Sequence, residues 1–224
     1  YEDIGNSLDQ FNKENLNTSL VRYYDGGSPT ALWAVRSLGI NPSDGRELFL
    51  TKEGTYTFEY DTEDEVVVGN SEPKLEGVLG STLYWKGFSF SLYFRYSLGA
   101  DVFTEATYNK VENISLAGLK SNQDKRALHD RWQKPGDHAK FKGISLTETT
   151  PISSRFVLRE NYIKAESISV GYDFESQAVQ KLGIQSLRLQ ANTTDLFRIS
   201  SIKEERGIEY PFARSFSFSL SAMF

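Results

Sequence analysis

The sequence predicts an all-β fold, namely about five C-terminal strands of an antiparallel transmembrane β-barrel with long external loops. Three observations predict it: apolar and polar residues alternate, the alternating segments run to ten or more residues, and short links alternate with long ones. A tilted strand needs about 9–11 residues to cross a membrane, whereas soluble sheets use strands of about 5–6. Outer-membrane barrels also combine short turns on one side with long loops on the other.

Alternation is most regular at the C-terminus. There Phe216, Phe218 and Leu220 fall on one face of the expected strand, and Ser217 and Ser219 fall on the other. Successive side chains of a strand point to opposite sides, so one face is apolar and the other is small and polar. We expect the apolar face to meet lipid and the polar face to line the lumen. The complete set of strands is expected near residues 74–85, 88–98, 156–174, 184–198 and 212–224.

The links between these strands differ in length. Lys86-Gly87 is a tight turn and 175–183 is a short link, whereas 99–155 and 200–211 are long. Barrels of the outer membrane have short periplasmic turns and long external loops. The short links, and with them the C-terminus, are therefore expected on the periplasmic side.

This topology divides the chain into two parts. Residues 1–73 are expected to be a long extracellular loop region, and residues 74–224 the C-terminal strands of the barrel. Five strands cannot close in lipid, because known barrels begin at about eight strands and an open edge leaves backbone groups unpaired. The barrel interpretation therefore requires further strands from sequence outside this chain.

A soluble antiparallel sandwich is the alternative, because its strands also alternate where one face packs on a core. The chain would then be a soluble or surface-exposed glycan-binding domain without transport activity. Strand length, the asymmetry of the links and the terminal Phe224 favour the barrel.

Composition argues against several functions. The chain has 25 Lys+Arg against 30 Asp+Glu and lacks the clustered basic face that nucleic-acid binding needs. It has no cysteine for a disulfide or a thiolate metal site. We find no nucleophile motif and no phosphate loop, so no enzymatic activity is expected. No cofactor or metal is expected either, because His129 and His138 lack the converging ligands of a metal site.

A series of motifs runs in order along almost the whole chain. Arg131-Trp132 is followed by Pro135-Gly136-Asp137, which is similar to an RWxxPGD loop. The other motifs are AVRSLGINP from Ala34, GN and PK from Gly69, SSRFV from Ser153, LRL from Leu187 and ERG from Glu205. The ordered series resembles the SusC-like (SusC/RagA type) TonB-dependent outer-membrane transporters.

The resemblance implies properties that the residues alone do not show. Members of this family are barrels of 22 strands with an N-terminal plug. A segment near their N-terminus contacts TonB, and a SusD-like surface lipoprotein forms a lid that captures glycans or peptides. The chain is thus expected to be the C-terminal part of a nutrient importer in the outer membrane. The plug and the TonB-contacting segment are expected outside this chain, and the substrate's identity is left open.

Candidate contact residues lie in the expected loops. Four of them are candidates for contact with substrate or lid: Trp33, Tyr108, Arg131 and Trp132. Aromatic rings can stack on sugars or peptide side chains, and arginine makes charge-assisted hydrogen bonds. Four others are expected to fix the loops: Asp137, Glu205, Arg206 and Tyr210. Fixing a loop is also the competing interpretation for Arg131 and Trp132, because a Pro-Gly turn follows them.

Overall fold

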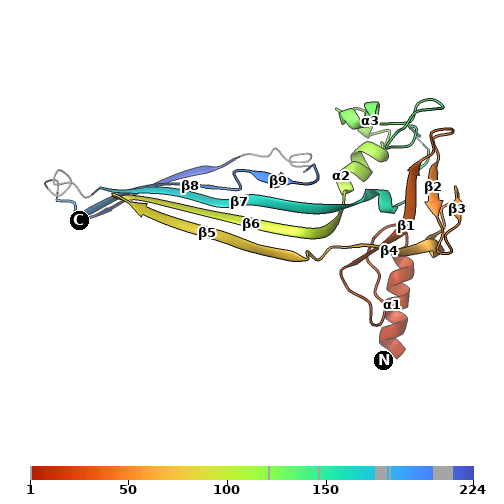
Figure 1. Ribbon diagram of the computed structural model, residues 1–224, viewed down its shortest axis with the longest axis horizontal. Helices are drawn as coiled ribbons and strands as arrows, with labels where there is room; N and C mark the ends of the chain where they lie inside the picture. Colours follow the sequence, from red (N-terminus) through yellow and green to blue (C-terminus); the bar gives the residue numbers. More distant parts are fainter. Residues whose placement is uncertain (1, 121, 146, 175–180, 182, 204–213) are drawn as a thin grey trace. The chain divides into compact units, whose positions relative to one another are not determined.

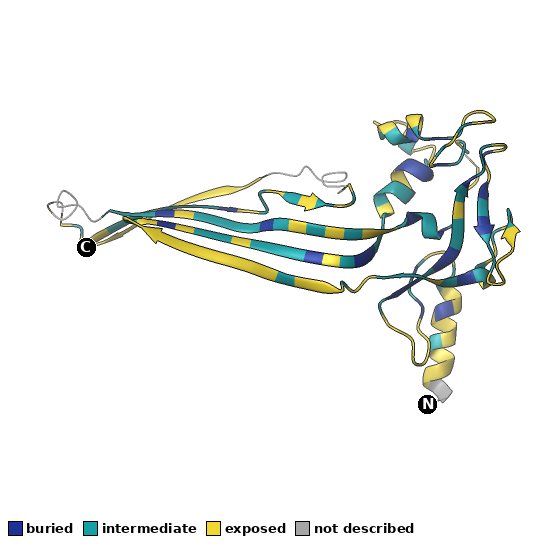
Figure 2. Ribbon diagram, in the orientation of Figure 1, coloured by how far each residue is buried: buried dark blue, intermediate teal, exposed yellow. Residues whose placement is uncertain are grey.

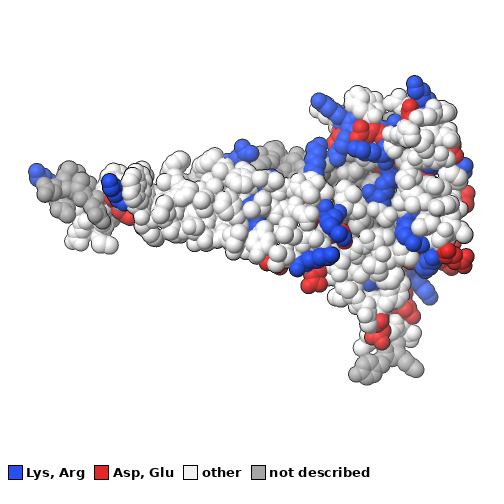
Figure 3. Space-filling view, in the orientation of Figure 1, with Lys and Arg blue, Asp and Glu red and all other residues white. Residues whose placement is uncertain are grey.

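The chain consists of two compact units (Figure 1). The loop unit comprises Tyr1–Glu72 and Ala100–Arg159, and the sheet unit comprises Pro73–Gly99 and Glu160–Phe224. The computed structural model describes residues 2–120, 122–145, 147–174, 181, 183–203 and 214–224. Charged side chains gather over the loop unit, whereas the sheet unit is largely uncharged in the same view (Figure 3).

The sheet unit is built on one antiparallel sheet. Its strands are β5 (Leu75–Trp85), β6 (Phe88–Phe103), β7 (Val157–Phe174), β8 (Ser186–Thr194), β9 (Arg198–Ser200) and β10 (Phe216–Met223). The described strands are ordered β10-β8-β7-β6-β5, and the short β9 pairs with β7 next to the region paired with β8. The predicted all-β antiparallel architecture is confirmed.

A two-residue turn joins β5 and β6. Trp85 pairs with Phe88, and the two residues between them, Lys86 and Gly87, have φ angles of 45° and 85°. Positive φ at both positions gives a turn whose twist matches that of the flanking strands. Glycine adopts this conformation without steric cost, which explains its place in the turn.

The two faces of the sheet differ in chemistry. The strand registers align alternating rows across β10, β8 and β7: Phe218, Ala191 and Val170, then Ser219, Gln190 and Gly171. The apolar face extends to β6 through Phe88, whose ring centroid lies 4.5 Å from that of Tyr172. The polar face extends to the same strand through Ser89, whose Oγ accepts a 3.0 Å hydrogen bond from Arg188. The alternation in the sequence is therefore a division between two faces.

The outermost strands of the described sheet, β5 and β10, are the most exposed (Figure 2). Each has a neighbour on one side only among the described strands. All of β10 is exposed, including Phe218 at 76% and Leu220 at 67%. A long edge strand with exposed apolar side chains pairs readily with another strand, so both edges are suited to further strand addition.

The loop unit contains a second antiparallel sheet, of order β3-β2-β1-β4. Its strands are β1 (Ala31–Ile40), β2 (Glu47–Leu50), β3 (Tyr56–Thr57) and β4 (Glu65–Asn70). The central strand β1 is the most buried, with Ala34 and Val35 each 1% exposed. Helix α1 (Glu2–Glu14) precedes this sheet in the chain.

The second segment of the loop unit consists mainly of short helices and turns. They are α2 (Glu105–Thr107), a π-helical turn (Tyr108–Glu112), α3 (Lys125–His129) and 3-10 turns at Gly118–Lys120 and Ser154–Phe156; another 3-10 turn, Thr62–Asp64, precedes β4. One apolar cluster joins Leu20, Leu32 and Ala34 of the first segment to Ile152 of the second. The two segments therefore share a core. None of the described helices is long and apolar enough to cross a membrane.

Candidate functional site

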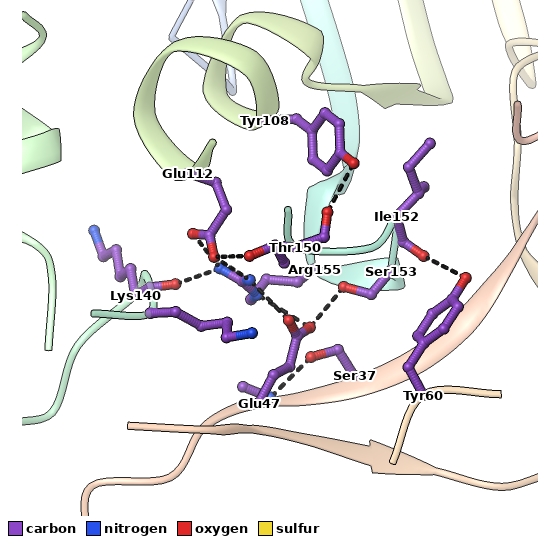
Figure 4. A network of polar contacts seen from close by, with 12 residues as sticks. Ser37, Glu47, Tyr60, Tyr108, Glu112, Lys140, Thr150, Ile152, Ser153 and Arg155 are labelled. Atoms are coloured by element: carbon purple, nitrogen blue, oxygen red, sulfur yellow. Dashed lines mark hydrogen bonds and ion pairs between the residues drawn. The ribbon is translucent and has the colours of Figure 1, made fainter. Parts of the chain in front are cut away.

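A buried ionic network ties the two segments of the loop unit together (Figure 4). Arg155 Nη2 lies 2.9 Å from Glu47 Oε2 and 3.1 Å from Glu112 Oε1, and these two glutamate side chains are 1% and 0% exposed. Ser153 Oγ donates a 2.7 Å hydrogen bond to Glu47, and Thr150 Oγ1 donates a 3.0 Å hydrogen bond to Glu112. The network thus joins β2, the π-helical turn and the residues that lead into β7.

The electrostatics of this network keep Arg155 charged. Burial alone would lower the pKa of the guanidinium, but its bonds to Glu47 and Glu112 outweigh burial and raise that pKa. Removing one partner of a buried ion pair leaves an uncompensated charge, which costs about 3–5 kcal/mol. The network therefore fixes the loops in place.

A second buried ion pair lies in the first segment. Arg22 donates to both carboxylate oxygens of Glu65, at 2.9 and 2.8 Å, and the side chains are 1% and 9% exposed. Burial raises the pKa of Glu65, although the hydrogen bond from Arg22 works in the opposite direction. The pair anchors the residues after α1 to the start of β4.

Arg131 lies inside the loop unit, where it is 5% exposed. Its Nη1 donates to the Lys142 carbonyl oxygen at 2.9 Å, and its Nη2 donates to the carbonyl oxygens of Glu112, at 2.7 Å, and of Val111. Burial lowers the pKa of the guanidinium. These contacts hold the start of the RWxxPGD loop against the π-helical turn.

Trp132 packs against the turn that follows β1. Its Nε1 donates to the Pro42 carbonyl oxygen at 2.9 Å. The ring lies so close to Gly45 that a Cβ there would be 2.5 Å from ring carbons, and Gly45 has a φ of +73°. Only glycine meets both requirements, the close approach and the positive φ.

Asp137 closes the same loop on itself. Its Oδ2 accepts hydrogen bonds from the backbone N–H of Gln133 at 3.1 Å and of Lys134 at 3.0 Å. Gly136 N also donates to the Pro42 carbonyl oxygen at 2.9 Å. These bonds stabilise the turn, as expected of an aspartate that caps nearby backbone groups.

Tyr108 and Trp33 have different surroundings. The Tyr108 hydroxyl donates to the Thr150 carbonyl oxygen at 2.8 Å, its ring centroid lies 5.1 Å from that of Phe156, and burial raises its pKa. The Trp33 ring instead lines a cavity of about 630 Å³, and its centroid lies 4.9 Å from that of Tyr24. The aromatic rings of Trp33 and Tyr24 thus lie side by side at this cavity.

Three candidate positions have no described structure. Glu205, Arg206 and Tyr210 lie outside the described residues. Within the described part of the chain, no group of three or more His, Cys, Asp or Glu residues is arranged to hold a metal ion.

The sequence alone assigned no role to Glu47 or Arg155. The available signal was Glu47 at the start of the short apolar run Leu48 to Leu50, because a charge that is buried with such a run needs a partner.

The sheet unit carries ion pairs on its polar face. Arg188 donates to Ser89 there, and its Nε lies 3.7 Å from Asp173. Arg95 Nη2 lies 2.8 Å from Glu166 Oε1. The opposite face carries the apolar rows of β6, β7, β8 and β10. The wall of a transmembrane barrel with an aqueous interior has this division into one polar and one apolar face.

Comparison with known proteins relates this chain to TonB-dependent receptors. No family model matches the chain. TonB-dependent receptor P39 of Formosa agariphila is 24% identical over 161 residues, which cover 70% of this chain and 15% of the relative. TonB-dependent receptor P3 of the same organism is 25% identical over 173 residues, which cover 77% of this chain and 16% of the relative. The chain therefore corresponds to a small part of these proteins.

Solved structures show the same fold. The RagAB peptide importer in its open-open state superposes with a TM-score of 0.69 at 16% identity, covering 87% of this chain and 22% of the other. In the closed-closed state the TM-score is 0.64 at 17% identity, covering 80% and 20%. The fold is thus that of a segment of an antiparallel outer-membrane barrel with its loops. The chain is therefore similar in sequence to TonB-dependent receptors and in fold to a segment of the RagAB importer, as its resemblance to the SusC-like transporters implies.

Proposed function

We propose that this chain forms the C-terminal wall and external loops of an outer-membrane importer that takes up a glycan or a peptide. The observation that carries the proposal is the two-faced sheet. Phe218 and Leu220 of β10 are 76% and 67% exposed on the apolar face, and the aligned Ser219 row lies on the other. A lipid-facing wall needs this arrangement, because hydrocarbon surrounds one side and water the other.

The remaining parts of the proposed importer lie outside this chain. An upstream plug and a segment that contacts TonB would couple uptake to energy from the inner membrane. A SusD-like lipoprotein would cover the external loops. The relatives are named TonB-dependent receptors and the solved structures are titled as a peptide importer, which supports the proposal. The chain itself performs no covalent chemistry in this scheme.

The proposed topology places the loop unit outside the cell and the Lys86-Gly87 turn and the C-terminus in the periplasm. The loop unit is held by buried ion pairs such as Arg155 with Glu47, as a folded external region requires. Among the four candidates for contact, Trp33 lines a cavity beside a second aromatic residue, Tyr24. Tyr108, Arg131 and Trp132 are proposed to act through the loops they hold, since their polar atoms bind backbone carbonyls.

Cysteine labelling of the complete transporter on intact cells tests this topology. The chain contains no cysteine, so single cysteines at Lys120 and at Lys86 report on the two sides. A membrane-impermeant maleimide should label the cysteine at 120 on intact cells and the cysteine at 86 only after the outer membrane is opened. Labelling of position 86 alone on intact cells would overturn the topology. The parent without added cysteine is the control.

A further inference from the structure

We propose that Tyr93 and Tyr96 fix the register of β5 against β6 and thereby hold the free edge of β5 in position for a further strand. This inference rests on the proposed function, which places the sheet in the wall of a barrel. Among the described strands, β5 has β6 as its neighbour on one side and none on the other. Backbone pairing alone specifies register weakly, so a strand held on one side can slip along its neighbour.

Each of the two tyrosines lies opposite a glycine of β5. Tyr96 pairs with Gly77, and Tyr93 pairs with Gly80. A Cβ at Gly80 would lie 2.5 and 2.6 Å from two carbons of the Tyr93 ring, and a Cβ at Gly77 would lie 2.7 Å from the Tyr96 hydroxyl oxygen. Both separations are too short for a Cβ atom. The rings therefore lie across the paired strand, in the space that side chains of β5 would take.

The two rings lie on opposite faces of the β5–β6 hairpin. Successive side chains of a strand alternate, so Tyr93 shares the polar face with Ser89, and Tyr96 shares the apolar face with Phe88. Gly77 is partly buried, whereas the other residues of β5 are exposed. An aromatic ring across a glycine of an edge strand covers backbone that the missing side chain leaves open, and it pins the pairing of the two strands. The hairpin is thus held from both faces.

The spacing of these residues selects one register. The two glycines are three residues apart and so are the two tyrosines, so both rings meet a glycine when the strands are aligned as observed. A slip of two residues would keep the faces matched but would place Tyr93 opposite Val78 or Thr82. Their side chains would occupy the space of the ring. The Lys86-Gly87 turn sets the same register at one end of the hairpin, and the two tyrosine–glycine pairs hold it further along.

Disulfide trapping in the complete transporter, free of other cysteines, tests the register. Glu76→Cys with Ser97→Cys reports the observed register, in which residues 76 and 97 pair. Val78→Cys with Ser97→Cys reports a slip of two residues. Each cysteine pair is introduced into the wild-type background and into Tyr93→Leu/Tyr96→Leu. The control background is Tyr84→Leu, because Tyr84 is 73% exposed and pairs with Ser89 instead of a glycine.

We expect the 76–97 disulfide to dominate in the wild-type and Tyr84→Leu backgrounds. In Tyr93→Leu/Tyr96→Leu its yield should fall severalfold, and the 78–97 disulfide should appear. Folded barrels are separated from unfolded protein by their heat-dependent electrophoretic mobility before the disulfides are measured. Disulfide yields that are the same in all three backgrounds would overturn the role of the two tyrosines.

A second set of variants tests the contact itself through the fraction of transporter that assembles in the outer membrane. Gly80→Ala should lower this fraction severalfold, because its Cβ meets the Tyr93 ring. Tyr93→Ala removes the ring, so Gly80→Ala should cause no further loss in that background. Ser81→Ala, at the next residue of β5, is the matched control and should leave assembly unchanged. Full assembly of Gly80→Ala, or losses that add when Gly80→Ala and Tyr93→Ala are combined, would overturn the contact.

Uptake measurements distinguish this inference from the proposed function, because disulfide yield and assembly report strand pairing and not transport. Register that depends on the tyrosines, in a wild-type transporter that takes up neither glycans nor peptides, would contradict import and leave the pairing role standing. Uptake by the wild type together with disulfides that are indifferent to Tyr93 and Tyr96 would contradict the pairing role and leave import standing.

Discussion

Replacing Phe218 by arginine tests which face of the sheet meets lipid. Phe218 lies six residues before Phe224 in the chain. At about 3.3 Å per residue and a tilt of about 40°, those six residues rise roughly 15 Å along the membrane normal. The apolar band of such barrels is about 25 Å tall, so Phe218 falls near its middle if Phe224 marks the periplasmic border.

The expected effect is large at Phe218 and small at its neighbour. Arginine at the bilayer midplane on the lipid side costs about 2–4 kcal/mol. Ser219→Arg places the same side chain one residue away on the polar face, aligned with Gln190, and should cost much less. The assay is guanidinium unfolding of the complete transporter, refolded into phosphatidylcholine vesicles. Equal losses at positions 218 and 219 would refute the assignment of the two faces.

Three further predictions concern the loop unit. Arg155→Met should lower the free energy of unfolding by about 3–5 kcal/mol, because it leaves two buried carboxylates without their partner; Arg46→Met, which breaks an exposed pair with Asp44, should cost at most about 1 kcal/mol in the same urea titration, and equal losses would contradict the network's role. Gly45→Ala should cost roughly 1–3 kcal/mol, because the new Cβ meets the Trp132 ring at a positive φ, whereas Gly54→Ala, with a φ of +88° and open space around it, should cost less; the reverse order would contradict the close contact. Burial raises the pKa of Tyr60, so its contribution to stability is complete below the unfolded pKa of about 10 and is lost as pH rises toward the folded pKa. Tyr60→Phe should therefore flatten the decline of stability above pH 10, as followed by circular dichroism, and an unchanged slope would refute this.

The strands of the sheet unit could be predicted from the sequence, because alternation and turn residues are local features of the chain. Alternating residues in β6, β7, β8 and β10 show directly which side chains share a face, and Lys86-Gly87 marks a turn by its chemistry alone. The register between strands follows from that turn and from the match of the faces. The open edges were also expected, because few long strands cannot close a barrel.

The loop unit was less predictable because its structure depends on contacts between distant residues. Helix α1 was not expected from the sequence, and its acidic, asparagine-rich composition gives only a weak helical signal. Glu47 and Arg155 are 108 residues apart in the chain, yet they share one ion pair. The spacing of Glu47 and Arg155 in the sequence does not indicate that they form a pair. The cavity that Trp33 lines is likewise formed by residues of α1, of β1 and of the segment 51–65. These residues meet only in the folded chain.

The central claim is that this sheet is the wall of a membrane barrel, and spin labels along β10 test it most directly. Nitroxides placed one at a time at positions 216 to 223 of the complete transporter in lipid vesicles would be probed by electron paramagnetic resonance. We expect accessibility to alternate with a period of two residues. Labels at 216, 218, 220 and 222 should be accessible to oxygen dissolved in lipid, and labels at 217, 219 and 221 to a water-soluble nickel complex. Uniform accessibility to the nickel complex along the strand would contradict a membrane wall.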